Sequence, residues 1–90
     1  MATELNFTKG DKAWAAEVVS TGTPMAVEVN RTEGGALLVQ GSVDGLRKVP
    51  LHYFDRNTDR DILFEVDVPE GVRIHLTSYA EVEASKAEGV

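Results

Sequence analysis

The chain contains no cysteine among its 90 residues, and it has only two histidines. No disulfide can stabilise the fold, and a structural zinc site built on thiolates is excluded. Small secreted domains often carry disulfides, so this absence favours synthesis and use in a reducing compartment. The first residues, Met1 to Asn6, have neither the basic nor the apolar region of a signal peptide, and we therefore predict none.

Long apolar runs and concentrated positive charge are also missing. No segment approaches the roughly 18 consecutive apolar residues of a transmembrane helix, so no membrane partner is expected. The formal net charge is −6, and the lysines and arginines are scattered along the chain. Negative charge repels phosphate groups, so we do not expect nucleic-acid binding. The acidity is interpreted as a source of solubility.

Recognisable catalytic motifs are missing as well. Gly34-Gly35 is followed by an apolar segment rather than by Lys and a helix, which excludes a phosphate-binding loop. No G-x-S-x-G motif accompanies the two histidines, His52 and His75. The carboxylates of Glu17, Glu28 and Glu65 are predicted on outward strand faces. A glycosidase needs two carboxylates on either side of a cleft, and a domain of this size has little volume for one. We predict a non-enzymatic protein without a cofactor; a catalytic domain would need one histidine to meet a carboxylate in a cleft.

Alternation of apolar and polar residues is the dominant pattern that the sequence does contain. The segments ILFEVDV (62–68) and VRIHLT (72–77) alternate strictly, which indicates half-buried β-strands. Pro69-Glu70-Gly71 between them predicts a three-residue hairpin turn. In that hairpin Glu65 faces His75, so His75 is interpreted as part of a surface pair across two strands.

Shorter runs of the same kind predict strands over most of the chain, at 5–8, 13–20, 25–30, 36–43, 46–54 and after 76. An Ala-rich helix is the alternative for 13–20. Asp44-Gly45 is the strongest two-residue hairpin signal, and Pro50 requires an edge strand or a bulge.

Together these features predict an all-β protein. We expect a small antiparallel β-sandwich, jelly-roll or Ig-like, with seven or eight short strands. It forms a single domain over residues 1–84, followed by a frayed tail at 85–90. The bulky candidates for its core are Phe7, Trp14, Tyr53, Phe54 and Phe64.

One polar loop has the oxygen spacing of a calcium site. Oxygen-bearing side chains occupy alternate positions, at Asp55, Asn57, Asp59 and Asp61. The EF-hand pattern then fails, because its sixth position is Arg60 and its twelfth is Val66. The alternative is a solvated loop whose carboxylates make local turns.

Two further groups of residues are candidates for binding. Trp14 and Tyr53 are core residues, or sugar-stacking platforms if they are exposed, and a lectin-like carbohydrate-binding module is our alternative function. The segment SYAEVEA predicts an edge strand that presents Tyr79, Glu81 and Glu83 to a neighbouring subunit, or an ordinary charged edge. A thin core favours homo-oligomerisation.

The opening half of the chain carries a family resemblance. It combines LNFTK (5–9), an aromatic-Ala-Ala-Glu segment (14–17) and VEVNRTEGGAL (27–37), interpreted as a hairpin. In these features it resembles small β-sandwich proteins encoded among the structural genes of phages and prophages of Bacteroides-type bacteria. The resemblance implies a capsid decoration, tail or fibre-associated protein that is made in the bacterial cytoplasm and resides in the virion. It implies other copies or other virion proteins as partners, and no catalytic or ligand residues.

Overall fold

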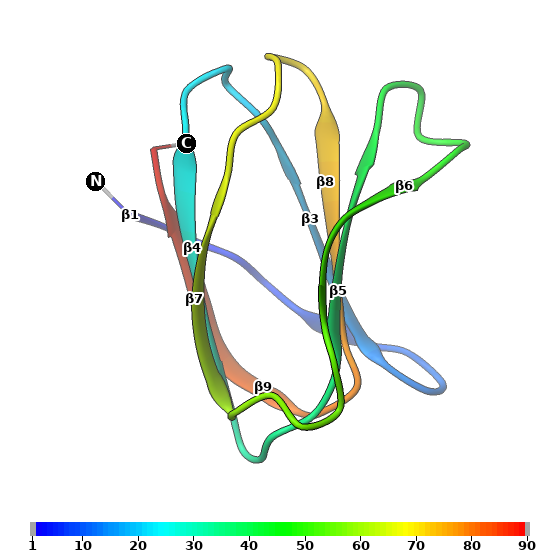
Figure 1. Ribbon diagram of the computed structural model, residues 1–90, viewed down its shortest axis with the longest axis vertical. Coiled ribbons are helices and arrows are strands. Elements are labelled where there is room, and N and C mark those ends of the chain that lie inside the picture. Colours follow the sequence, from blue (N-terminus) through cyan, green and yellow to red (C-terminus); the bar gives the residue numbers. More distant parts are fainter. Residues whose placement is uncertain (1, 90) are drawn as a thin grey trace.

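Two antiparallel β-sheets face one another in the computed structural model, which describes residues 2–89 (Figure 1). Sheet A contains, in spatial order, β1 (Ala2–Glu4), β9 (Val82–Glu88), β4 (Met25–Arg31) and β7 (Asp61–Val66). Sheet B contains β2 (Thr8–Lys9), β3 (Trp14–Val19), β8 (Arg73–Ser78), β5 (Leu37–Ser42) and β6 (Val49–Phe54). The predicted all-β sandwich is confirmed. No helix that could cross a membrane occurs in residues 2–89.

The order of the strands is that of a jelly roll. The first strand, β1, pairs with the last, β9; moving inward along the chain, β3 pairs with β8, β4 with β7, and β5 with β6. Successive pairs alternate between the two sheets, as they do when one long hairpin is rolled up. The short β2 is an addition beside β3. This order decides between the two predicted topologies in favour of the jelly roll.

Alternation determines which side chains fill the space between the sheets. In β4 the buried residues Met25, Val27 and Val29 alternate with more exposed neighbours. The segment at 13–20 forms the predicted strand rather than a helix, and Ala16 and Val18 face the core. The fully buried part of the core consists of Leu5, Ala16, Met25, Val27, Val29, Leu37, Val39, Ile62, Val66, Ile74, Leu76 and Ala87.

The aromatic residues divide between core and surface. Phe7, Phe54 and Phe64 pack against the core, as predicted. Trp14 is half-buried at the end of its strand, whereas Tyr53 retains 65% of its surface, so its assignment to the core is wrong.

The predicted hairpin around Pro69-Glu70-Gly71 is wrong. Strand β7 pairs with β4 in sheet A, whereas β8 pairs with β3 and β5 in sheet B. Residues 67–72 therefore cross from one sheet to the other (Figure 1). Gly71 has the expected positive φ of 89°, but its amide donates to the Ser20 carbonyl, so the loop after β3 holds this crossing. Residues 32–36 cross between β4 and β5 in the same way, so the expected hairpin at 27–37 is also wrong.

The β5–β6 hairpin is the one that the sequence located correctly. Asp44-Gly45 lies in the loop that joins these paired strands, although this loop spans residues 43–48 rather than two residues. Strand β6 is an edge strand, and the register shifts between Val39 and Gln40 opposite it. Pro50 therefore lies on an edge beside a bulge, as expected for a residue that cannot donate to the ladder.

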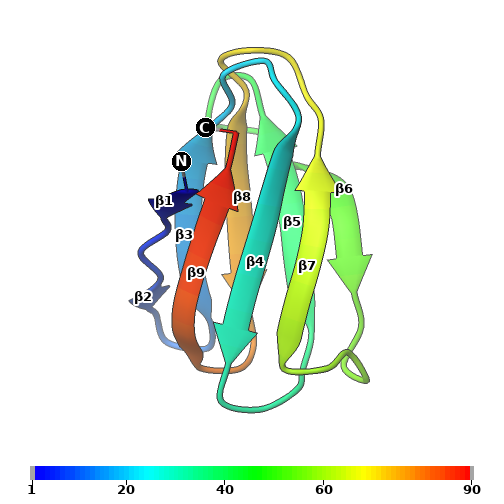
Figure 2. The same ribbon diagram turned by 90° about the vertical axis from the view of Figure 1, so that its left-hand side faces the viewer.

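The predicted frayed tail is wrong for residues 85–88. They belong to β9, which lies between β1 and β4, and Ser85 and Ala87 are buried (Figure 2). Val90 lies outside the described residues. SYAEVEA is likewise not one edge strand, because 79–81 form the turn between β8 and β9. The small buried side chains of the segment gave little apolar signal, which is why the sequence suggested a tail.

Candidate interaction surfaces

The loop that resembled a calcium site is occupied from within by Arg31. This residue continues the inward positions of β4 and has no exposed surface. Its Nη2 donates to the Asp59 carbonyl at 2.7 Å and its Nε to the Arg60 carbonyl at 3.1 Å. Its Nη1 donates to the Ala36 carbonyl and to Ser78 Oγ, both at 3.3 Å. Burial lowers the pKa of the guanidinium, and the charge of Asp61 acts in the opposite direction.

The four candidate calcium ligands do not converge. Asp55 Oδ1 accepts a hydrogen bond from the Asn57 amide at 2.9 Å, which closes a local turn. Asp59 offers its carbonyl to Arg31, and Asp61 binds Asn30 and contacts Arg60. Within residues 2–89, no three acidic, histidine or cysteine residues gather in a metal-binding arrangement. The guanidinium of Arg31 binds the carbonyl oxygens of Asp59 and Arg60, so these oxygens are not available to a metal cation.

His75 lies on the outer face of sheet B and pairs with a different acid from the one predicted. Its register partner on β3 is Glu17, and Nδ1 lies 3.4 Å from Glu17 Oε2. Glu65 is in the other sheet, so the expected Glu65–His75 pair does not form. The Nε2 atom is buried without a hydrogen-bond partner among the described residues. The pair lies beside a hollow of about 260 Å³ that Lys48 also lines.

His52 closes the open side of the sandwich. Strands β6 and β7 are both edge strands, and they lie on the same side of the molecule (Figure 2). His52 Nε2 lies 3.1 Å from the Glu65 carbonyl, which can only accept, so Nε2 carries the proton in this contact. The ring of His52 also lies against Phe54 and Phe64, with centroids 6.1 and 5.8 Å away. This role is structural, and the sequence did not indicate it.

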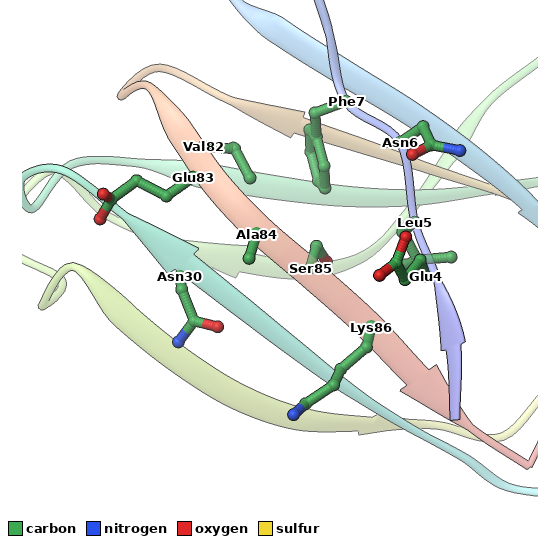
Figure 3. A pocket seen from close by; sticks show the side chains of 10 residues that line it. All are labelled: Glu4, Leu5, Asn6, Phe7, Asn30, Val82, Glu83, Ala84, Ser85 and Lys86. Atoms are coloured by element: carbon green, nitrogen blue, oxygen red, sulfur yellow. The ribbon is translucent and has the colours of Figure 1, made fainter. Parts of the chain in front are cut away.

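A groove of about 410 Å³ opens where the N-terminal segment leaves β9 (Figure 3). The Leu5 amide donates to the Ser85 carbonyl, and beyond this bond the two segments diverge. Residues 4–7 form one wall, while residues 82–86 and Asn30 form the rest. The predicted Glu83 is part of this groove, but Tyr79 and Glu81 are not. The groove has room for a short extended chain, and its side chains do not form an acid–base pair.

The two candidate sugar-stacking residues lie on opposite faces of sheet B. Across sheet B, Trp14 is opposite Ser78, Ser78 is opposite Leu37, and Leu37 is opposite Phe54. Residues that are opposite one another share a face, and Phe54 packs against the core, so Trp14 also faces inward. Tyr53 precedes Phe54 in the same strand and therefore faces outward. One of the two aromatics is thus available on the outer surface, and the pair cannot form one platform.

The β5–β6 hairpin exposes apolar and basic side chains together. We use the name apolar-basic loop for residues 43–48. Val43 and Leu46 are 86% and 85% exposed, and Arg47 and Lys48 are adjacent in sequence. Asp44 Oδ1 accepts hydrogen bonds from the Leu46 and Arg47 amides at 2.8 and 3.2 Å. These bonds lower the pKa of Asp44, that from Leu46 most. The loop is therefore ordered while its apolar side chains point into water.

Glycine is required at the tip of this loop. Gly45 has a positive φ of 82°, and its amide donates to Ser42 Oγ at 2.6 Å. A Cβ atom at this position would collide with the guanidinium of Arg73. The guanidinium of Arg73 therefore lies close to Gly45 and adds a third positive charge beside the loop.

The outer face of sheet A carries an exposed leucine surrounded by acids. Leu63 is 74% exposed and lies opposite Glu28 in the register of β4 and β7. Asp61 and Glu65 flank it on the same strand and face. Asn30 Nδ2 donates to Glu28 Oε2 at 3.2 Å and to Asp61 Oδ1 at 3.1 Å, which fixes both carboxylates. We use the name acidic face for Glu28, Asp61, Leu63 and Glu65.

We compared the chain with protein-family models, with curated proteins and with solved structures, and none of these comparisons found a match. The function is therefore inferred from the surfaces described above and from the resemblance of the first half of the sequence. Two of these surfaces, the apolar-basic loop and the acidic face, expose large apolar side chains within a ring of charge. Such patches are typical of contact sites between proteins.

Proposed function

We propose that the chain is a non-enzymatic structural and interaction protein, a phage or prophage virion accessory that acts as a capsid decoration, tail or fibre-associated module. The observation that carries this proposal is the apolar-basic loop. Val43 and Leu46 remain 86% and 85% exposed although hydrogen bonds from backbone amides to the side chains of Ser42 and Asp44 order the loop around them. An ordered loop that keeps branched apolar side chains in water contributes little to its own fold, and it suits contact with another surface.

The architecture and the resemblance support the same proposal. Jelly rolls are common in viral capsid proteins and in lectins, so the fold is compatible with assembly but does not determine it. The first half of the chain resembles phage structural proteins, and this resemblance supports the virion as the assembly to which the protein binds. Contact through preformed surfaces requires neither a cofactor nor a metal.

Fractionation of phage particles tests the proposal. We would add an affinity tag to the chromosomal gene in the bacterium that carries it, induce the prophage, and separate particles from soluble proteins on a density gradient. The protein should sediment with the particle band, and Val43→Asp with Leu46→Asp should lower its incorporation. Tyr79→Asp is the matched control, because Tyr79 is apolar and 56% exposed but lies in the β8–β9 turn. A native protein that stays with the soluble fraction of an induced lysate would refute the proposal.

Carbohydrate binding is the second candidate, and the exposure of Tyr53 favours it. This ring is 65% exposed on the outer face of sheet B, beside Leu38 and across the sheet from Thr77. An exposed ring next to a hydroxyl group suits stacking on a sugar. A glycan array would show binding by the native protein that Tyr53→Ala abolishes and Trp14→Phe retains. An array without any bound glycan would remove this candidate.

A further inference from the structure

We infer that copies of this chain bind one another head to tail, with Leu63 of one copy seated in an apolar hollow beside the apolar-basic loop of the next. This inference rests on the proposed function and names a second copy as the partner. Its basis is the complementarity of two surfaces in shape and in charge.

The hollow has the size and lining that a leucine side chain requires. It measures about 350 Å³ and lies between the base of the apolar-basic loop and the edge of sheet B. Its apolar lining includes Val49, Leu51 and Val72, and the charged side chains of Asp44 and Arg47 line it as well. Leu63 projects from the acidic face with 74% of its surface exposed, so its insertion removes apolar surface from water on both copies.

The charges around the two surfaces are opposite in sign. Three acids, Glu28, Asp61 and Glu65, surround Leu63, and the contacts of Lys86 with Glu28 and of Arg60 with Asp61 offset part of their charge. The hollow is lined by both Arg47 and Asp44, while Lys48 follows Arg47 in the loop and Arg73 lies against Gly45, so the loop carries a net positive charge. Opposite rims guide the approach of two proteins and fix their relative register. Hydrogen bonds from Asn30 order two of the acids, and those to Asp44 order the loop. Little conformational freedom remains to be lost on binding, which favours association.

The two surfaces belong to different layers of the sandwich. Sheet A forms one layer, and the loop before β6 projects from the other layer (Figure 1). A single copy therefore cannot bring its own Leu63 to its own hollow. In a bound pair, one copy retains a free hollow and the other retains a free Leu63. Such a heterologous contact produces a ring or an open row of subunits. A net charge of −6 disfavours the alternative in which the loop binds an anionic membrane.

Mixing two complementary variants tests this geometry. Leu63→Asp removes the side chain that inserts and leaves the loop intact, whereas Val49→Asp places a charge in the hollow and leaves the acidic face intact. We expect the sedimentation coefficient of the native protein to rise with concentration at low salt. Each variant alone should weaken self-association by about tenfold or more. The equal mixture should form one heterodimer that does not grow further, because only one intact interface remains.

Several results would overturn the inference. One such result is a native protein that remains monomeric up to about 1 mM, a concentration at which even a contact with a Kd of about 1 mM would bring a large fraction of the copies together. A second such result is that each variant alone associates as strongly as the native protein. A third is that the mixture of the two variants stays monomeric. Binding of the loop to phosphatidylserine vesicles without self-association would assign the loop to a membrane instead. A monomer that still enters phage particles would retain the proposed function and remove only the inference.

Controls separate loss of contact from loss of fold. Tyr79→Asp, in the β8–β9 turn, should associate like the native protein. Circular dichroism and thermal unfolding of every variant should match those of the native chain. If Val49→Asp unfolds, Val43→Asp replaces it, because Val43 also lines the hollow, is 86% exposed and lies outside any strand.

Discussion

Arg31 is the residue on which one end of the sandwich depends. Its guanidinium joins the 55–60 loop, the β4–β5 connection and the end of β8 through four hydrogen bonds. The sequence did contain a signal for this role, because Arg31 follows Val27 and Val29 at the inward positions of an alternating strand. When a charged residue occupies an inward position, either its side chain is buried among hydrogen-bond partners or the strand ends at that residue. Which oxygens receive it could not be predicted, because they come from loops distant in the chain.

Replacing Arg31 should therefore destabilise the protein strongly. Arg31→Met keeps much of the apolar stem but leaves carbonyls of Ala36, Asp59 and Arg60 without their donor. We expect the free energy of unfolding to fall by about 2–4 kcal/mol. Urea denaturation measures this, and Arg47→Met on the exposed loop should change it by less than about 0.5 kcal/mol. Equal denaturation midpoints for the two variants would contradict the assigned role.

The carboxylate of Asp44 makes the order of the apolar-basic loop dependent on pH. Its folded pKa lies below the ordinary 3.8, because it accepts the Leu46 and Arg47 amides. Its charged form therefore stabilises the loop above pH 3.8, and this contribution is lost as the pH falls through the lower folded pKa. In an NMR titration, the Leu46 and Arg47 amide signals should shift together below pH 3.8. A midpoint above that value would be inconsistent with these hydrogen bonds.

At the scale of elements, the sequence predicted which side of each strand faces the core but not which strand lies beside it. Ile62, Val66, Ile74 and Leu76 are buried as the alternation indicated. A period of two is satisfied equally by two strands of one hairpin and by two strands in facing sheets. Pro69-Glu70-Gly71 supports a reversal in either case. Only competition for partners among all strands, which is a property of the whole fold, decides between them.

Engineered disulfides distinguish the two arrangements, and the chain has no cysteine of its own to interfere. Ala26 and Glu65 are register partners on β4 and β7, so Ala26→Cys with Glu65→Cys should oxidise to an intramolecular disulfide. Glu65→Cys with His75→Cys should not, because these residues lie on the outer faces of different sheets. Non-reducing electrophoresis and mass spectrometry of monomeric protein provide the measurement. Efficient oxidation of this second variant to an intramolecular disulfide would restore the hairpin and refute the jelly roll.

Strand β9 should be essential for folding although its composition resembles a tail. Ala87 is fully buried between β1 and β4, whereas Ala84, on the same strand, is exposed. Ala87→Asp should lower the free energy of unfolding by more than about 3 kcal/mol, because it buries an unpaired carboxylate. Ala84→Asp should lower it by less than about 1 kcal/mol. Thermal unfolding curves compare the two, and similar melting temperatures would indicate that β9 does not pack as described.

At the scale of the whole molecule, the local charge of each surface depends on how the residues are distributed between the two layers of the sandwich. The sequence showed Leu63 among acids, at a position where alternation points away from the core. It also showed Leu46 next to Arg47 and Lys48. It could not show that these two groups lie on opposite layers of the sandwich, because that follows from the jelly-roll order. Trp14 and Tyr53 did not form one platform for the same reason, because the order and register of the strands place them on opposite faces of sheet B.

Head-to-tail association should weaken as salt is added. Part of its free energy comes from exposed rims of opposite charge, and salt screens such charges over about 10 Å at 0.1 M. Light scattering of the native protein should therefore show a smaller mean mass at about 0.5 M than at about 0.02 M salt. Association that is unchanged or stronger at high salt would indicate an interface governed by apolar contact alone.

The pairing of β1 with β9 has a consequence for how the chain folds. The strand β1 lies near residue 2, yet its partner strand comes from residues 82–88, about 80 positions later in the chain. The adjacent strands β5 and β6 can join early, while the remaining pairs must wait for progressively later segments. Because such distant pairings form slowly, we expect the roll to close from β5 and β6 outward, with β1 and β9 pairing last.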